Sequence, residues 1–222
     1  MSVEPDLSDL PLPKIPACLQ LRSVTKGLMQ YSEAMKFENY RHAAHVCLWA
    51  PQEGSSRFGQ LRAAVMMQLR FDGTFGFPGG LMNKGEDVVT GLNREVSEEI
   101  GWDSTAHPIT LKDYFSTQVI DGRNLVLHFF IKQLTLEQFS AVEKGCPLSK
   151  DYGDEVMGSV RVPLYTMANM YNGLPAFINN KFVGSAKQQL LLALHHVKLF
   201  TEEEINEVIL KSQNLKLSSK QF

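Results

Sequence analysis

The chain has 222 residues, a length typical of one domain of ordinary size. Hydrophobic residues make up 44% of it and charged residues 21%, so the composition predicts a buried core and excludes a chain that is disordered throughout. The formal net charge of −2 excludes a uniformly basic nucleic-acid binder, and any contact with RNA needs a local basic patch.

The N-terminus and the cysteines bear on the cellular compartment. The first residues contain no basic cap followed by an apolar stretch, so they predict no secretory signal. No stretch approaches the roughly 18 uninterrupted apolar residues that a membrane helix needs. Cys18, Cys47 and Cys146 lie far apart in no metal or redox spacing, which fits a reducing compartment. We expect a soluble protein with no membrane contact that is not secreted, in the nucleus (nucleolus or nucleoplasm), the cytoplasm or both.

Prolines and hydrophobic patterns divide the chain into three parts. Residues 1 to about 20 are rich in proline and show no period. We therefore expect a flexible leader over residues 1–25, a single folded domain over 26–212 and a tail over 213–222. Strand-like runs occupy residues 42–50, 63–71, 111–118, 125–133 and 156–162, and helix-like runs occupy 87–101, 135–144, 185–200 and 201–212. Residues 73–80 are dense in turn formers, and the whole pattern predicts an α/β sandwich.

The helix predicted at residues 87–101 is unusual in where it carries acidic side chains. At about 100° per residue, Leu92, Val96 and Ile100 form one apolar stripe. Glu99 falls inside this stripe, and Glu95 and Glu98 lie on its shoulder. Burying several carboxylates together is costly unless a cation compensates their charge. A hard divalent ion such as Mg²⁺ or Mn²⁺ prefers oxygen ligands of this kind. For Glu98 alone, a solvated acidic face explains the pattern equally well.

The residues around this helix form a known motif. The run Gly80-x5-Glu86-x7-Arg94-Glu95-Val96-x-Glu98-Glu99-x-Gly101-Trp102 resembles a complete Nudix box, with only Trp102 departing from the usual aliphatic residue. The resemblance implies a Nudix-type α/β/α sandwich with a mixed β-sheet. It also implies that Glu95, Glu98 and Glu99 bind the metal, that Arg94 orients neighbouring carboxylates, and that Gly79 offers its carbonyl to the metal.

Further segments resemble one subgroup, the Nudix enzymes that decap small nucleolar RNA and hydrolyse inosine diphosphates. They span residues 41–195 and include Arg41-His42-Ala43-Ala44-His45, Met67-Gln68-Leu69-Arg70-Phe71-Asp72-Gly73, Gly76-Phe77-Pro78-Gly79-Gly80, Val160-Arg161-Val162-Pro163-Leu164-Tyr165-Thr166 and Gly184-Ser185-Ala186-Lys187-Gln188-Gln189-Leu190-Leu191. By this resemblance, His45 and Gln189 contact a purine edge, Phe77 stacks on it and Arg70 pairs with phosphate. Ordinary packing or surface roles for these four side chains remain open at this point.

Two other positions follow from the same resemblance. Glu155 supplies a further carboxylate, as a metal ligand or as the base that activates water. A solvated loop acid is the alternative for Glu155, and the adjacent Asp154 is a rival for its role. Gln118 stands where the subgroup can carry a histidine, and a neutral amide is a poor ligand for a hard ion. We therefore expect one metal site to be weaker, or substrate preference to differ.

The predicted reaction is metal-dependent hydrolysis of a phosphoanhydride bond in a substrate linked to a nucleoside diphosphate. Two or three Mg²⁺ or Mn²⁺ ions are expected, with Glu98, Glu99 and Glu155 as catalytic residues. The resemblance favours inosine or deoxyinosine diphosphate and the 5′ cap of RNA as substrates, and a homodimer as the assembly. ADP-ribose-type and dinucleotide-cap substrates remain open. The rival from another class is a non-catalytic module that binds RNA or protein; close relatives of that kind lose the box glutamates, which are all present here.

Overall fold

The computed structural model describes residues 12–19 and 26–218. Its strands are β1 (Lys26–Met29), β2 (Arg41–Pro51), β3 (Ser55–Ser56), β4 (Gly59–Gln60), β5 (Ala63–Arg70), β6 (Phe75–Gly76), β7 (Gly79–Leu81), β8 (Tyr114–Ile120), β9 (Leu125–Gln133) and β10 (Val156–Arg161). Its α-helices are α1 (Tyr31–Ala34), α2 (Val88–Ile100), α3 (Leu136–Gly145), α4 (Leu174–Phe177), α5 (Ala186–His196) and α6 (Glu202–Ser218). Short 3₁₀ helices include η2 (Ala17–Leu19), η3 (Leu111–Asp113) and η4 (Asp121–Arg123).

A mixed sheet forms the centre of the molecule. Its strand order is β1-β8-β9-β2-β5-β10, with β7 paired to β2 and β6 paired to β5. The strands β2 and β9 run parallel in an unbroken register from Arg41↔Leu125 to Trp49↔Gln133, whereas their other pairings are antiparallel. Neighbouring residues on these strands face opposite sides, so each central strand is buried on both faces. The strand predicted at residues 125–133 is confirmed.

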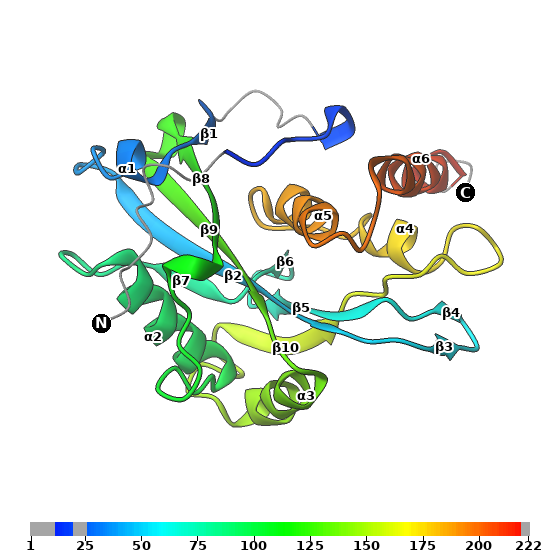
Figure 1. Ribbon diagram of the computed structural model, residues 1–222, viewed down its shortest axis with the longest axis horizontal. Coiled ribbons are helices and arrows are strands. Elements are labelled where there is room, and N and C mark those ends of the chain that lie inside the picture. The colour runs from blue at the N-terminus through cyan, green and yellow to red at the C-terminus, as the bar shows by residue number, and fades with distance from the viewer. Residues whose placement is uncertain (1–11, 20–25, 219–222) are drawn as a thin grey trace.

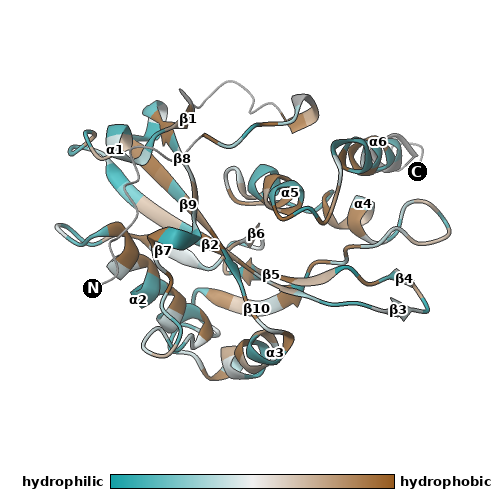
Figure 2. Cartoon of the chain, viewed as in Figure 1, coloured by the Kyte–Doolittle hydropathy of each residue, from teal (hydrophilic) through white to brown (hydrophobic). Residues whose placement is uncertain are grey.

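Helices cover both faces of this sheet (Figure 1). On one face, α2 and α3 lie against β2, and the α2 side chains Leu92, Val96 and Ile100 are fully buried. Figure 2 shows apolar and polar residues interleaved along α2, as expected of a helix with one buried side. Asp87 caps this helix by accepting from the N–H groups of Val89 and Thr90, and Gly101 ends it in a left-handed conformation.

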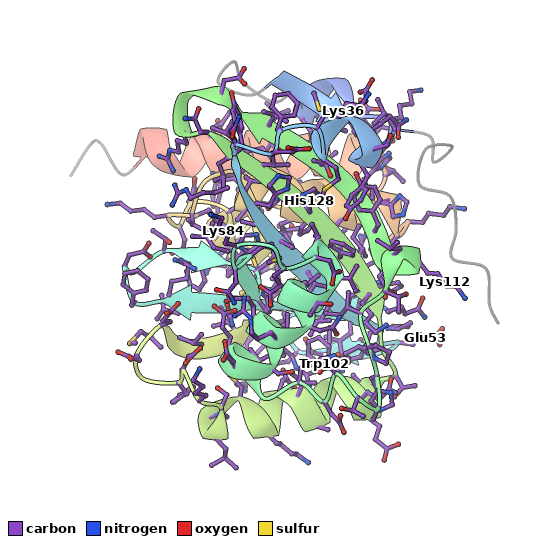
Figure 3. All side chains as sticks on the ribbon, turned by 90° about the vertical axis from the view of Figure 1, so that its left-hand side faces the viewer. Lys36, Glu53, Lys84, Trp102, Lys112 and His128 are labelled. Atoms are coloured by element: carbon purple, nitrogen blue, oxygen red, sulfur yellow. The ribbon has the colours of Figure 1, made fainter. Side chains whose placement is uncertain are left out.

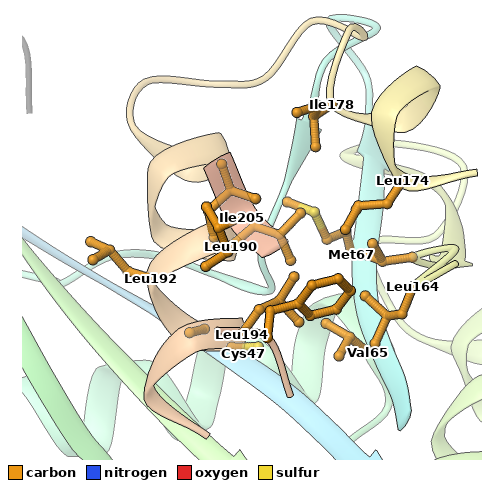
Figure 4. Close-up of a cluster of buried hydrophobic side chains, with 14 of the residues drawn as sticks. Cys47, Val65, Met67, Leu164, Leu174, Ile178, Leu190, Leu192, Leu194 and Ile205 are labelled. Carbon is orange, nitrogen blue, oxygen red and sulfur yellow. The ribbon is translucent and has the colours of Figure 1, made fainter. Parts of the chain in front are cut away.

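The opposite face is covered by α5, with α4 and α6 beyond it. Leu190 and Leu194 of α5 pack into a cluster with Val65 and Met67 of β5 (Figure 4). Every other residue of β5 points to this cluster and the intervening ones point to α2, so one strand serves both cores. The predicted α/β/α sandwich is confirmed. No helix within residues 12–19 and 26–218 is long and apolar enough to cross a membrane.

Several predicted bounds differ from the structure. The turn-rich segment 73–80 includes β6 and the start of β7, because Gly79 adopts φ +125° and lets a short strand pair with β2. The strand expected from residue 111 begins only at Tyr114, after η3. The helix expected over 185–200 ends at His196, and the next one continues to Ser218, into the predicted tail.

The predicted flexible leader also differs from the structure. Residues 12–19 pack against α5 and α6 through η2, and Leu19 is only 4% exposed. The proline pattern of this segment indicated only that it is not a regular helix or strand, and a buried leucine needs neither. The remaining residues of the expected leader, 1–11 and 20–25, lie outside the described residues.

Candidate active site

A cleft of about 430 Å³ lies between the sheet and the N-terminal end of α5. All the side chains and the glycine predicted to form the site line it, except Glu98: His45, Arg70, Phe77, Gly79, Glu95, Glu99, Glu155 and Gln189. These residues come from β2, β5, the segment 77–80, α2, the loop before β10, and α5. Residues separated by more than a hundred positions therefore converge on one space.

Glu99 is the most deeply buried carboxylate of this cleft. Its side chain is 2% exposed, and its Oε2 accepts from the Gly79 N–H at 2.7 Å and from the Gln68 Nε2 at 3.2 Å. Burial raises the pKa of Glu99 to about 7, although the two hydrogen bonds favour the ionised form. A buried carboxylate held in this way is fixed in place, and the positive charge of Arg70 offsets only part of the cost of burying it.

The glycines beside Glu99 allow a close approach of chain and carboxylate. A Cβ on Gly79 would collide with the carbonyl oxygen of Ala44, and a Cβ on Gly80 would collide with the Glu95 carboxylate. Glycine is therefore required at position 79 by backbone sterics and by its left-handed φ, whereas a side chain at position 80 would displace the Glu95 carboxylate. The carbonyl of Gly79 as a metal ligand stays a prediction; the structure shows its N–H bonded to Glu99.

Arg94 connects the acidic side chains of the motif. Its Nε and Nη2 donate to Glu86 at 3.0 and 2.9 Å, and its Nη1 donates to Glu95 at 2.7 Å and to Glu98 at 3.1 Å. The guanidinium fork holds the pKa of Glu86 near 2, helped by the Asn83 N–H. Arg94 thus orients Glu86, Glu95 and Glu98, whereas Glu99 is held by Gly79 and Gln68 instead.

Glu98 does not line the cleft. Its Oε1 accepts from the Lys150 Nζ at 2.6 Å, and its Oε2 accepts from Arg94. The Lys150 ammonium, followed by the Arg94 guanidinium, lowers the pKa of Glu98. In this arrangement Glu98 is a partly exposed ion-pair partner, which differs from the ligand position expected from the sequence. Glu98 thus lies outside the cleft lining but beside Glu95, since both accept from the Arg94 Nη1, and its role as a metal ligand stays a prediction.

The cleft residues fit a hard divalent ion by two observations. Burial raises the pKa of both Glu95 and Glu99, so a cation placed between them would relieve a real cost. Gln68 Oε1 is buried beside them with no hydrogen-bond partner among the described residues. The donor set is oxygen only, which suits Mg²⁺ and Mn²⁺. Across residues 12–19 and 26–218, no three acidic, histidine or cysteine side chains lie close enough together to hold an ion as they stand, so Glu95, Glu99 and Glu155 share the cleft without forming a complete set of ligands.

His45 occupies the cleft floor between the acidic cluster and α5. Burial, and secondly the positive charge of Arg70, lower its pKa to about 4. The ring is therefore neutral near pH 7, with one nitrogen that donates and one that accepts. Gln189 of α5 is 6% exposed and lines the same cleft, so an amide and an imidazole are both available to a polar base edge.

Comparisons with known proteins identify the family of this chain. Residues 42–200 match the model of the Nudt16-like family, described as U8 snoRNA-decapping enzyme-like. The chain belongs to this family. It is 45% identical over 175 residues to the U8 snoRNA-decapping enzyme of Ovis aries, covering 77% of this chain and 89% of that relative. It is 42% identical to the Xenopus laevis enzyme of the same name over 187 residues, covering 82% and 88%.

Two further proteins are similar to this chain. The Tudor-interacting repair regulator protein of Homo sapiens is 40% identical over 182 residues, covering 80% of this chain and 84% of that one. A mutT/nudix family protein from Listeria innocua shares the fold with a TM-score of 0.50 at 13% identity, covering 72% and 94%. This Nudt16-like chain is a Nudix hydrolase, as the motif predicts, and Nudix enzymes generally use divalent metal ions.

The remaining predicted residues of this Nudt16-like chain, Glu155, Phe77 and Gln118, lie in or beside the cleft. Glu155 lines the cleft whereas its rival Asp154 does not. Phe77 is 1% exposed, lines the cleft and packs on Phe129 with ring centroids 5.0 Å apart, and its stacking on a purine stays a prediction. Gln118 is buried beside the cleft and accepts from the Ser185 hydroxyl at 3.3 Å. Its effect on metal or substrate choice stays a prediction.

Sequence reasoning missed several residues in and beside the cleft. Gln68 holds Glu99, and its only sequence signal was a polar residue at the end of an apolar run. Arg41 and Arg123 line the outer end of the cleft although they are far apart in sequence. Arg41 was part of a segment that resembles the subgroup, but no pattern linked it to Arg123.

Proposed function

We propose that this protein hydrolyses phosphoanhydride bonds in the 5′ cap of RNA and in inosine or deoxyinosine diphosphate, with two or three Mg²⁺ or Mn²⁺ ions. The observation that carries the proposal is the convergence of Glu95, Glu99 and Glu155 in one cleft with the neutral His45. The relatives named as U8 snoRNA-decapping enzymes support the capped-RNA substrate. The inosine diphosphate substrate rests on the resemblance and on the polar groups available to a purine edge.

The position of each residue in the cleft indicates its proposed role. The carboxylates of Glu95, Glu99 and Glu155 would hold the ions, and Glu155, which is exposed, is the candidate to take a proton from the attacking water. When bound, such ions neutralise phosphate charge and promote deprotonation of that water. Arg70 is placed to pair with a phosphate oxygen, because it lines the cleft; its Nε has no hydrogen-bond partner among the described residues and lies 3.7 Å from the Asp72 Oδ2 in a long ion pair.

The indirect contacts keep this geometry in place. Gly79 and Gln68 fix the Glu99 carboxylate, and Arg94 fixes that of Glu95. We propose that Glu98 acts through Arg94 in the described arrangement, and that a direct metal or catalytic role for it requires release from Lys150. Positioning of this kind matters because ligand geometry within a fraction of an ångström determines the rate.

The direct test is a panel of substrates with each metal. We expect phosphate-bond cleavage of capped RNA and of inosine diphosphate in Mg²⁺ or Mn²⁺, and none after chelation, with products identified by mass. ADP-ribose-type and dinucleotide-capped compounds belong in the panel as the alternative substrates. Cleavage of those alone would replace the proposed substrates, and a lack of cleavage of every compound would contradict the enzymatic proposal.

The alternative function is a non-catalytic module that binds RNA or protein. The relatives named as Tudor-interacting repair regulator proteins are the reason to consider it. The retained and converging carboxylates favour the enzyme. We also propose a homodimer and a nuclear location, either nucleolus or nucleoplasm, with the cytoplasm as the alternative. Light scattering of the purified chain and imaging of a tagged protein test these two points.

Base recognition gives a separate prediction. If His45 and Gln189 read a purine edge, alanine at either position should lower kcat/KM for inosine and guanosine diphosphates more than for uridine and cytidine diphosphates. A polar group left unpaired costs about 1–3 kcal/mol, or roughly 5-fold to 150-fold in kcat/KM. An equal loss on all four nucleotides would show that these residues position phosphate or support the fold.

A further inference from the structure

The cleft has a second end that the proposed chemistry does not use. Arg41 and Arg123 line it, above a floor formed by Ile120, Leu125 and Leu127. This end lies at the corner where β2 and β9 begin and β8 ends (Figure 1). This end can therefore bind a part of the substrate that does not contact the carboxylates.

Backbone geometry brings the two arginines together. Arg41 pairs with Leu125 across β2 and β9, and Leu125 pairs with Ile120 across β9 and β8. The Arg41 N–H also donates to the Asn124 carbonyl at 2.9 Å, which ties the start of β2 to the turn that carries Arg123. Asn124 holds this turn with a left-handed φ of 47°. The pair is thus set by the sheet register.

The distance from the reaction centre is set by β2. Arg41 and His45 lie on the same face of this strand and are four residues apart, which corresponds to about 13 Å at 3.3 Å per residue. His45 in turn pairs with Gly79, whose N–H holds Glu99. A nucleotide whose phosphates reach Glu99 and whose base contacts His45 leaves the arginine end to another part of the substrate.

The charges of this end fit a phosphate chain. Both arginines are exposed, and neither forms an ion pair within the described parts of the chain. The acid in the same turn, Asp121, accepts a hydrogen bond from the Tyr40 hydroxyl. Guanidinium groups pair with phosphate oxygens through parallel hydrogen bonds, and a half-buried apolar floor accepts a sugar or base. A protein of net charge −2 has no general attraction for RNA, so such a local pair would matter.

We propose that Arg41 and Arg123 bind backbone phosphate of the RNA strand attached to the nucleotide being hydrolysed, so that the strand leaves the cleft at this end. The inference rests on the proposed decapping function and adds to it a subsite for the polynucleotide. A free nucleoside diphosphate has no group that extends to the two arginines. The subsite therefore distinguishes a capped RNA from a mononucleotide through its sugar-phosphate chain.

The test compares one double variant on two substrates. For Arg41→Gln combined with Arg123→Gln, we expect kcat/KM on a capped RNA oligonucleotide to fall about 10-fold to 100-fold. For inosine diphosphate we expect a change below about twofold. The salt dependence of RNA binding should also weaken, by roughly one unit of log-log slope for each phosphate that the variant no longer neutralises. Arg57→Gln is the matched control, because Arg57 is an exposed arginine on the β3–β4 hairpin and does not line the cleft.

Two outcomes overturn the subsite. An equal fall on both substrates would assign the arginines to the reaction centre or to stability, and an unchanged rate on RNA would make them ordinary surface charges. Failure of the proposed function is distinguishable, because the unaltered protein would then cleave neither substrate. In that case, binding of the capped oligonucleotide without metal, measured by fluorescence anisotropy for both proteins, still decides whether the arginine pair contacts RNA.

Discussion

Replacing Glu99 by glutamine should lower kcat by about 100-fold to 1,000-fold, the usual range for loss of one preorganised charged group at a reaction centre. The change keeps the shape of the side chain, and its remaining carbonyl oxygen can still accept from the Gly79 N–H. What it removes is the buried negative charge that a divalent ion would neutralise. Single-turnover and steady-state rates on capped RNA, in Mg²⁺ and in Mn²⁺, measure the effect.

Stability should move in the other direction, which separates catalysis from folding. The pKa of Glu99 in the folded, metal-free protein is about 7, above its ordinary value of 4.5. Ionisation therefore disfavours the folded state, and stability falls as the pH rises from about 4.5 to 7. Glutamine removes this penalty, so the Tm of the metal-free variant at pH 8 should equal or exceed that of the unaltered protein.

Glu137→Gln provides the matched control, because Glu137 is an exposed carboxylate on α3. It should leave the rate unchanged and lower the Tm only slightly, because Glu137 lies in the first turn of α3, where a negative charge is mildly stabilising. Near-normal turnover of Glu99→Gln in both metals would contradict the assignment of Glu99 to the metal centre. A rate loss that merely follows a lower Tm would contradict it as well, since the assignment requires an intact fold.

The chemistry of the α2 helix could be predicted because it depends on local periodicity. A helical period places Glu99 among the leucine and valine side chains of one face, and a buried glutamate in that position calls for a compensating group. The structure places Glu99 there, 2% exposed. The mixed sheet followed in the same way from strand patterns and the resemblance, since β2 and β9 have apolar residues on both faces.

Features that depend on long-range pairing could not be predicted. Whether Glu98 faces the cleft or an ion pair is decided by Lys150, fifty-two residues away, and no helical wheel contains that information. The arginine pair at the outer end of the cleft depends on the register of β2 against β9. Leu19 is buried because α5 and α6 happen to cover it, although its neighbours are typical of a loop.

A second feature of the core could not be predicted from the sequence. His128 of β9 is fully buried, and Figure 3 shows it inside the layer of strands, whereas Lys36 and Lys112 lie at the periphery. Its Nδ1 lies 2.8 Å from the Thr117 hydroxyl, and its Nε2 lies 3.0 Å from the Nδ1 of His42. The Tyr114 hydroxyl lies 2.8 Å from that of Thr117. One consistent proton order satisfies the chain if His128 is neutral: Tyr114 donates to Thr117, Thr117 to His128, and His128 to His42.

This arrangement makes the protein sensitive to acid. Burial, and then the neighbouring His42, lower the pKa of His128 to about 3, from an ordinary value of 6.5. The unfolded chain therefore binds a proton that the folded chain excludes between these values, and stability is lost as the pH falls below 6.5. At 1.36 kcal/mol per pKa unit, the loss from pH 6.5 to pH 4.5 is about 3 kcal/mol from this group alone.

The expected result is a smaller acid loss in His128→Gln, because glutamine can donate and accept a hydrogen bond but does not titrate. Urea unfolding at pH 7.5 and at pH 4.5 gives the free energy of unfolding for both proteins. The difference between the two pH values should be smaller in the variant by about 3 kcal/mol, whatever its stability at pH 7.5. His45 and His196 also have lowered pKa values and contribute acid sensitivity to both proteins equally. An identical pH dependence in the variant would show that acid acts through those histidines or through the carboxylates, and that the buried chain tolerates a charged His128.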